Sequence, residues 1–251
     1  MSKRLTRLFI FYLILIGLWQ GLSLLKIWPE YIFPTPVGVV KTLIAGFEDR
    51  TFIIGILISM KRIFIGYGLS IAIGLCLGLL IGRVKILDET LGSLVLGFQA
   101  LPSICWLPLA LLWFGLSESA MQTVVILGSL FSIIIGADTG VKNVPPIYIR
   151  AARTMGTKGL HLYTKVIIPA ALPSIISGLK QGWSFAWRSL MAAELLYVGL
   201  GLGHLLMMGR ELNDMNQVIA VMIVIIVIGI VVDRLIFAKI GNKIRERWGL
   251  V

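Results

Sequence analysis

The stretch Arg150-Ala151-Ala152-Arg153-Thr154-Met155-Gly156 decides the interpretation of the whole chain, because it is polar and cationic yet lies between two long apolar runs. It continues through Lys158 and Lys165 to Val166-Ile167-Ile168-Pro169. Glycines and a proline interrupt it, and an irregular polar backbone is not stable against lipid. We therefore interpret the loop of about 141–170 as an element that lies outside the membrane and docks on another protein.

The composition of this loop predicts a short helix followed by a turn. Residues 147–155 are good helix formers, and Gly156 permits a bend or a close approach. The small side chains of Ala151 and Ala152 leave room for another surface, while the arginines and lysines can pair with carboxylates on a soluble partner. An ordinary cytoplasmic loop without a partner would have a similar composition.

The same loop resembles a known family motif. Ala151, Ala152, Gly156 and Pro169 match by identity and spacing the EAA loop of binding-protein-dependent ABC transporter permeases, which reads Glu-Ala-Ala, three residues, Gly, nine residues, Ile-x-Leu-Pro. Arg150 stands at the usual Glu position, which reverses the charge there. The resemblance implies a coupling helix that sits in a groove of an ATPase subunit. It assigns this coupling role to Arg150, Ala151, Ala152, Arg153, Gly156 and Pro169.

The composition of the chain indicates an integral membrane protein. Its 251 residues are 58% hydrophobic and 14% charged, with a mean hydropathy of +0.95. No soluble globule of this size can hide so much apolar surface. The net charge of +11 comes from cations at the ends of apolar runs, which favours membrane topology over nucleic-acid binding. We expect one transmembrane permease domain over residues 1–251, in contact with membrane lipid and without nucleic acid.

The chain offers little catalytic chemistry. Cys76 and Cys105 lie in apolar runs without a neighbour at metal-ligand spacing, and His161 and His204 are far apart in sequence. We see no Ser-His-Asp constellation and no Gly-rich phosphate loop with Lys-Ser/Thr. We therefore expect no metal, no cofactor and no enzyme activity, and we assign ATP hydrolysis to a separate subunit.

Six apolar runs predict six membrane spans. They are about Leu8–Leu25, Ile63–Gly82, Leu91–Leu116, Ala120–Ala137, Ser174–Val198 and Val218–Val232.

The segments between these spans set the predicted topology. Residues of about 26–62 form an external segment that contains an interfacial helix over Val37–Phe47. Gly74, Gly78 and Gly82 fall on one stripe, which predicts close helix packing. The termini and the loops at 83–90 and 141–168 hold most of the Lys and Arg residues, so both termini are predicted to be cytoplasmic in a cell (inner) membrane.

Four residues are candidates for the translocation pathway. Pro102 and Pro108 break the third span, and such backbone is tolerated only inside a bundle or beside a water-filled cavity. Arg188 and Glu194 lie in the fifth span, where a charge costs about 2.5–3.5 kcal/mol at mid-depth and so faces a cavity or a partner. Lys180 is close enough to the cytoplasmic end for its side chain to reach the interface.

Further matches narrow the resemblance to one branch of the family. Leu101-Pro102, Leu112-Trp113-Phe114-Gly115, Ala192-Ala193-Glu194 and the Asp before the basic tail are similar to permeases for nitrate, sulfonates and taurine. The resemblance implies an all-α, type I ABC importer permease that forms half of a dimeric pathway. It also implies two ATPase subunits, an external substrate-binding protein, a second permease copy and a small anionic solute of the sulfonate, taurine or nitrate class.

Other interpretations remain open from the sequence. Related permeases move heterocyclic or other small nutrients, for which Arg188 has no need to contact an anion. A secondary transporter usually has an internal repeat and paired ion-site features, and a membrane enzyme needs a catalytic polar cluster. We find neither pattern, and neither class accounts for the docking loop.

Overall fold

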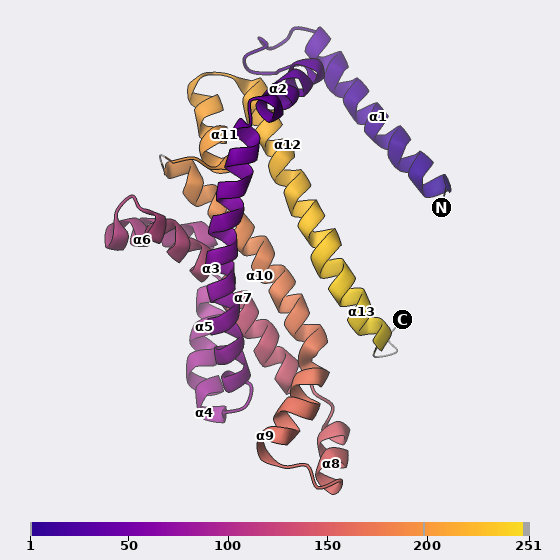
Figure 1. The fold of residues 1–251 in the computed structure, drawn as a ribbon, viewed down its shortest axis with the longest axis vertical. Helices are drawn as coiled ribbons and strands as arrows, with labels where there is room; N and C mark the ends of the chain where they lie inside the picture. The colour runs from indigo at the N-terminus through magenta and orange to yellow at the C-terminus, as the bar shows by residue number, and fades with distance from the viewer. Residues whose placement is uncertain (1, 198, 248–251) are drawn as a thin grey trace. The chain divides into compact units, whose positions relative to one another are not determined.

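The computed structural model describes residues 2–197 and 199–247, and its secondary structure over these residues is entirely helical (Figure 1). The α-helices are α1 (Ser2–Leu24), α2 (Pro36–Glu48), α3 (Thr51–Ile81), α4 (Lys85–Leu87), α5 (Ser93–Gln99), α6 (Leu107–Phe114), α7 (Glu118–Lys142), α8 (Pro146–Thr154), α9 (Gly159–Leu162), α10 (Ile168–Leu196), α11 (Leu202–Glu211), α12 (Met215–Val232) and α13 (Lys239–Arg247). Short π-helical turns η1 (Asp88–Gly92), η3 (Tyr163–Ile167) and η4 (Asp233–Ala238) and the 3-10 turn η2 (Ser103–Trp106) connect some of them.

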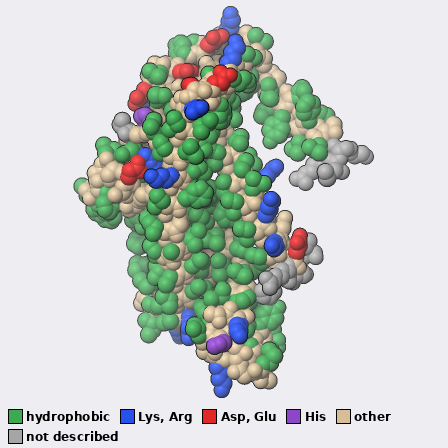
Figure 2. Space-filling model, in the orientation of Figure 1, with side chains coloured by type: hydrophobic (Ala, Val, Ile, Leu, Met, Phe, Trp, Pro, Cys, Tyr) green, Lys and Arg blue, Asp and Glu red, His purple; other side chains and the backbone are tan. Residues whose placement is uncertain are grey.

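Five helical segments among the described residues are long and apolar enough to cross a membrane. They are Leu5–Leu24, Thr51–Ile81, Glu118–Lys142, Gly159–Leu196 and Met215–Ile244. A bent pair, Lys85–Gln99 with Ser103–Phe114, brings the number to six if it counts as one span. Apolar side chains cover much of the visible face of the long helices (Figure 2). The prediction of about six spans in an all-α protein is confirmed, although Val198, the predicted end of the fifth span, lies outside the described residues.

The third predicted span is not one straight or gently kinked helix. Its two halves meet at 103°, and Pro102 stands at the junction in an extended conformation. Pro108 lies in the first turn of α6, where a missing N–H costs no hydrogen bond. The prolines therefore break the span into two helical pieces rather than bending it.

Helix α3 begins well before the span predicted at Ile63. The run from Thr51 contains no proline, so nothing in the sequence stops the helix, and Asp49 Oδ1 accepts a hydrogen bond from the Thr51 N–H at 2.8 Å. This hydrogen bond lowers the pKa of the Asp49 carboxyl below its usual value. Lys61 and Arg62, which the sequence analysis assigned to the external segment, lie within the helix.

The contacts divide the chain into two compact units. Unit 1 comprises the chain up to Ser59 together with Glu194–Val227, and unit 2 comprises Met60–Ala193 together with the chain from Ile228. That both units form a single permease domain stays a prediction.

Unit 1 contains α2, for which the sequence predicted a helix over Val37–Phe47. Thr35 caps this helix through its side chain, which accepts from the Gly38 N–H at 3.0 Å. Trp19 of α1 donates from Nε1 to the Pro34 carbonyl at 3.0 Å, which ties the first helix to the turn before α2.

Glycines bring three helices of unit 2 into close contact. A Cβ atom at Gly78 would lie 2.5 Å from the Ile134 carbonyl oxygen, so α3 and α7 touch through their backbones. This confirms the packing role predicted for the stripe of glycines on α3. A Cβ atom at Gly136 would likewise lie 2.5 Å from the Cα of Gly178, so α7 and α10 are packed equally tightly.

Aromatic side chains pack α10 against α3 within unit 2. The rings of Trp183 and Trp187 are stacked at 6.3 Å, and Tyr67 of α3 meets Trp183 edge-on at 5.4 Å. The Tyr67 hydroxyl donates to the Leu179 carbonyl at 2.7 Å. Helix α10 is therefore fixed against both α3 and α7.

The close contact between α7 and α10 predicts a sharp response to one methyl group. We expect Gly178→Ala to destabilise the protein by about 1–3 kcal/mol, because the added carbon overlaps the Gly136 backbone. Gly68→Ala is the matched control, since a Cβ atom there meets nothing within 4 Å and Ala favours helix more than Gly. Thermal unfolding of both variants in detergent measures the difference, and equal stability would show that α7 and α10 are not packed this closely.

Candidate functional site

The predicted docking helix exists, and consecutive prolines start it. Pro145 is extended (φ −55°, ψ 129°), and Pro146 occupies the first turn of α8, where no intrahelical N–H is needed. Val144, just before them, is buried. Because α7 ends at Lys142, the chain turns from a long helix directly into α8, and α8 lies beyond the end of α7 in Figure 1.

Gly156 ends α8 with a defined hydrogen-bond pattern. The Gly156 N–H donates to the Arg153 carbonyl at 3.0 Å, and the Thr157 N–H donates to the Ala152 carbonyl at 3.0 Å. These two bonds form a Schellman motif, which needs a left-handed residue at the position of Gly156. Its φ of +85° meets that need, and a side chain there would be strained.

The docking segment is anchored on its inner side to α7 and α10. Ile149 of α8 packs against a buried cluster that includes Val144 and Ala171. Farther along, the Tyr163 hydroxyl donates to the Leu79 carbonyl at 2.6 Å. Helix α8 is therefore in direct packing contact with the cluster at the first turns of α10.

Among the described residues, no acidic side chain forms an ion pair with the outer side of the segment. Arg150 and Arg153 are exposed, as is Met155 at 78%. Of the two adjacent alanines, Ala152 is 3% exposed and packs inward, while Ala151 is exposed. Lys and Arg side chains gather at the end of the molecule where α8 and α9 lie (Figures 1 and 2). This surface is apolar and cationic, and its sequence contains no Asp or Glu from Asn143 to Pro169.

Pro169 lies at the start of α10, directly after the π-helical turn η3. A proline at this position has no N–H to bond the preceding turn, and wider π-helical turns accommodate such gaps. Pro173 follows one turn later inside α10. The junction between the docking segment and α10 therefore lacks two backbone hydrogen bonds.

Two of the pathway candidates lie close to the same small cavity in unit 2. This cavity of about 230 Å³ is lined by Pro102, Trp106 and Phe185 among others. Arg188 is exposed, donates from Nε to the Ser184 carbonyl at 3.1 Å, and places its guanidinium 4.8 Å from the centre of the Phe185 ring. Pro108 lines neither of the two cavities described here.

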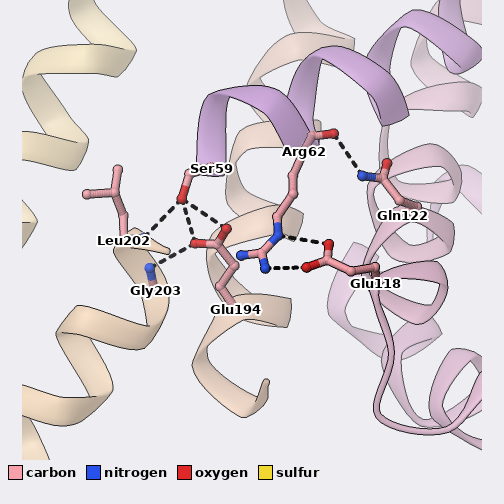
Figure 3. A network of polar contacts seen from close by, with 7 residues as sticks. All are labelled: Ser59, Arg62, Glu118, Gln122, Glu194, Leu202 and Gly203. Carbon is pink, nitrogen blue, oxygen red and sulfur yellow. Dashed lines mark hydrogen bonds and ion pairs between the residues drawn. The ribbon is translucent and has the colours of Figure 1, made fainter. Parts of the chain in front are cut away.

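Glu194, the other candidate, is fully buried in unit 1. Its carboxylate accepts hydrogen bonds from the Ser59 hydroxyl at 2.8 and 2.9 Å and from the Gly203 N–H at 2.9 Å (Figure 3). Ser59 Oγ in turn accepts from the Leu202 N–H at 2.9 Å. The two side chains thus cap the N-terminus of α11, which has no cap of its own. A pathway role for Glu194 stays a prediction.

An ion pair within unit 2 was missed by sequence reasoning. Arg62 of α3 has a side chain only 6% exposed, and its Nε donates to Glu118 Oε2 at 2.9 Å while Nη2 donates to Oε1 (Figure 3). Gln122, one turn after Glu118, donates to the Arg62 carbonyl at 3.1 Å. The signal was the Glu-x-x-x-Gln spacing on α7, which puts both side chains on one face.

A second ion pair stands beside a larger cavity of unit 2. Lys180 Nζ lies 2.9 Å from Asp233 Oδ1, so Lys180 is paired rather than only reaching for the interface as the sequence suggested. The cavity has a volume of about 670 Å³ and is lined by parts of α7, α10 and α13. Gln99 lines both this cavity and the smaller one.

Comparison with solved structures identifies the fold. The chain superposes on a subunit of the MetNI methionine ABC transporter in an inward-facing conformation with a TM-score of 0.65. The match covers 77% of this chain and 96% of the other at 17% sequence identity. Together with the helical spans, it confirms the type I ABC importer permease fold.

Curated relatives agree with this fold. A Methanocaldococcus jannaschii protein named as an ABC transporter permease is 39% identical over 81% of this chain and 78% of its own length. A Bacillus subtilis protein named as an aliphatic sulfonates transport permease is 30% identical over 94% of this chain and 84% of its own. The taurine transport system permease of Escherichia coli is 28% identical over 88% and 82%, respectively.

A family model covers the part of the chain that contains the smaller cavity, most of the larger one, and helix α8. The model describes the inner membrane component of binding-protein-dependent transport systems, and it matches residues 70–238. The match includes the loop with Ala151, Ala152 and Gly156 that first indicated this family. The chain belongs to the family of binding-protein-dependent transport system inner membrane components, the permease subunits of ABC importers.

Proposed function

We propose that this permease imports a small oxyanion of the sulfonate, taurine or nitrate class. The observation that carries the proposal is the exposed guanidinium of Arg188 in a membrane-spanning helix, 4.8 Å from the ring of Phe185, which lines the same cavity as Pro102. A charge at this depth is costly unless water or a ligand solvates it. A guanidinium offers forked donors that suit planar or tetrahedral oxyanions. The sulfonate and taurine permeases among the relatives support the same class of solute.

Membership of the family implies an ATPase partner and a substrate-binding protein. We propose that α8 is the element that docks on the ATPase, through the exposed surface of Arg150, Ala151, Arg153 and Met155. This surface has no acidic residue, so an acidic groove is its natural complement. Because Ile149 packs against the cluster at the start of α10, movement of α8 would reach the helix that holds Arg188.

The proposed assembly follows from the same reasoning. Two ATPase subunits would require two docking helices, and hence a second permease copy, as a homodimer. An ATPase acts from the cytoplasm, so α8 and the basic chain termini would share the cytoplasmic side. The side chains of Lys3, Arg4, Arg245 and Arg247, which contributed to this prediction, lie outside the described residues.

A permease that depends on a separate ATPase should not hydrolyse ATP itself. We expect the purified chain to show no ATP turnover, because its sequence contains no phosphate-binding loop. Addition of the purified ATPase subunit should produce turnover that depends on both proteins. ATP hydrolysis by the permease that persists after contaminating ATPases are removed would contradict the proposed division of labour.

Gly156 offers a test of the docking helix. We expect Gly156→Leu to reduce ATPase capture by the membrane-inserted permease, since the left-handed turn strains a branched side chain by about 1–2 kcal/mol and the bulk obstructs the partner. Gly156→Asn is the matched variant, because Asn tolerates this conformation. It should retain more capture than the Leu variant. Co-purification with the ATPase measures both, and normal capture and transport by Gly156→Leu would exclude α8 as the docking element.

Arg188 offers a test of the substrate class. We expect Arg188→Gln to lower uptake of methanesulfonate, taurine or nitrate by about tenfold or more, as expected for loss of hydrogen bonds to a charged group. Arg234→Gln is the matched control, because it removes the same charge from another exposed arginine, which lies in η4. Uptake into proteoliposomes holding the whole importer and its binding protein gives the rates. Unchanged uptake by Arg188→Gln, with assembly intact, would make Arg188 a structural residue.

A further inference from the structure

Helix α10 has a continuous polar arc at membrane depth. Its members are exposed and recur at intervals of three and four residues: Ser177, Lys180, Gln181, Ser184 and Arg188. The neighbouring Trp183, Ala186 and Trp187 are buried. The arc extends for about 17 Å, or roughly half the thickness of the hydrocarbon core. Lipid cannot solvate two cations and three uncharged polar side chains in a row, so this arc faces water, a ligand or another protein chain.

One cavity of unit 2 is lined by this arc, and a second lies next to it. The smaller one is lined by Phe185, whose ring lies 4.8 Å from the Arg188 guanidinium. The larger one is lined by Lys180 and Gln181, and Gln99 lines both. Gln99 is held in place by its hydrogen bond to Ser132 Oγ at 3.1 Å. Lys180 therefore lines the larger cavity, Arg188 contacts a residue that lines the smaller one, and Gln99 is common to both cavities.

The larger cavity has the donors that an oxyanion needs. Its volume of about 670 Å³ is within the usual range for small-molecule sites. Hydroxyl and amide groups reach it from three helices, through Thr139 of α7, Ser174 and Gln181 of α10, and Asn242 of α13. Lys180 is the one charged side chain among the described residues that line it, and its Nζ is paired with Asp233.

We propose that this larger cavity is a second oxyanion site, at which Lys180 exchanges the Asp233 carboxylate for the oxyanion. The proposal rests on the proposed function and adds a second step to it. Along α10, Lys180 and Arg188 are eight residues or about 12 Å apart, which is too far for one small anion to contact both. A solute in contact with Arg188 would therefore pass on to the larger cavity, where it would contact Lys180.

Asp233 gives the second site a moderate affinity. In the empty site the Lys180–Asp233 pair is close to neutral, which lowers the cost of a cation at this depth. An arriving oxyanion competes with the carboxylate for Lys180, and the carboxylate restores the pair when the oxyanion leaves. A pathway needs sites that bind well enough to admit a solute and weakly enough to release it.

The same chemistry could be supplied by a free solute or by the phosphate of an anionic lipid, because basic pockets between membrane helices also bind lipid headgroups. The complete importer in nanodiscs separates the two sources. Radiolabelled methanesulfonate, or nitrate, is bound in phosphatidylcholine alone and again with phosphatidylglycerol present. Methanesulfonate or nitrate binding in phosphatidylcholine supports a solute site, and binding abolished by phosphatidylglycerol supports a lipid headgroup at the same oxyanion site.

Variants of the two partners give opposite expected results. Lys180→Met should weaken methanesulfonate binding by about tenfold or more, because the charged donor is lost. Asp233→Asn should strengthen it by about threefold or more and slow its release, because the competing carboxylate is gone while Lys180 remains. Lys180→Arg should keep most of the affinity. Lys61→Met is the matched control, since Lys61 is an exposed lysine of α3 that lines neither cavity.

A purely structural ion pair predicts a different pattern. Both Lys180→Met and Asp233→Asn would then lower yield and thermal stability alike and would not shift affinity in opposite directions, and this result would overturn the proposal. Failure of the substrate class is recognised separately, because wild-type importer would then take up neither methanesulfonate nor nitrate. Inorganic phosphate binding by the same variants tests the second site even in that case, and phosphate binding insensitive to Lys180→Met would exclude the site.

Discussion

The cost of placing charge in a medium without water is the constraint on which the rest of this structure depends. An isolated ion at membrane depth is expensive, so each charged side chain in a span must find a partner, a cavity or a route to the interface. Arg62 forms an ion pair with Glu118, and Lys180 forms one with Asp233. Glu194 receives hydroxyl and backbone N–H donors at the start of α11. Arg188 differs from these, because its guanidinium lies over an aromatic ring, donates to a backbone carbonyl and remains exposed.

Close helix packing holds together the helices of unit 2 that carry some of these charges. Helices α7 and α10 touch through Gly136 and Gly178, where the absence of side chains lets the backbones meet. Dense packing of this kind moves as a unit rather than deforming continuously. Helix α8 packs against one end of the α7–α10 pair, and the polar arc lies along α10. Helix α8 and the two cavities are therefore packed around the same pair of helices in unit 2.

The sequence predicted what is local and missed what depends on distant contacts. The helix of the docking segment, its end at Gly156 and the glycine stripe of α3 follow from propensity and spacing, and all are present. The break at Pro102 was predicted, but its angle of 103° and the early start of α3 were not, because apolar periodicity does not say where a span leaves the membrane or how far a proline turns it. The pair of Lys180 and Asp233 joins residues far apart in sequence, so only the packing of α10 against η4 could reveal it.

Arg150 shows why a charge reversal at a motif position need not change the fold. Its side chain is exposed, and its backbone carbonyl accepts from the Thr154 hydroxyl at 3.1 Å in the manner of any helical residue. An exposed ion pair contributes only about 0–1 kcal/mol, so exchanging Glu for Arg there removes little stability. The fixed requirements of the segment are instead steric: a left-handed residue at Gly156 and a small buried side chain at Ala152. These steric requirements do not fix the charge at position 150. Such a charge affects the choice of partner more than the affinity, because electrostatic complementarity mainly gives specificity. The segment from Asn143 to Pro169 therefore keeps the geometry of the family motif while its sequence contains no acidic residue.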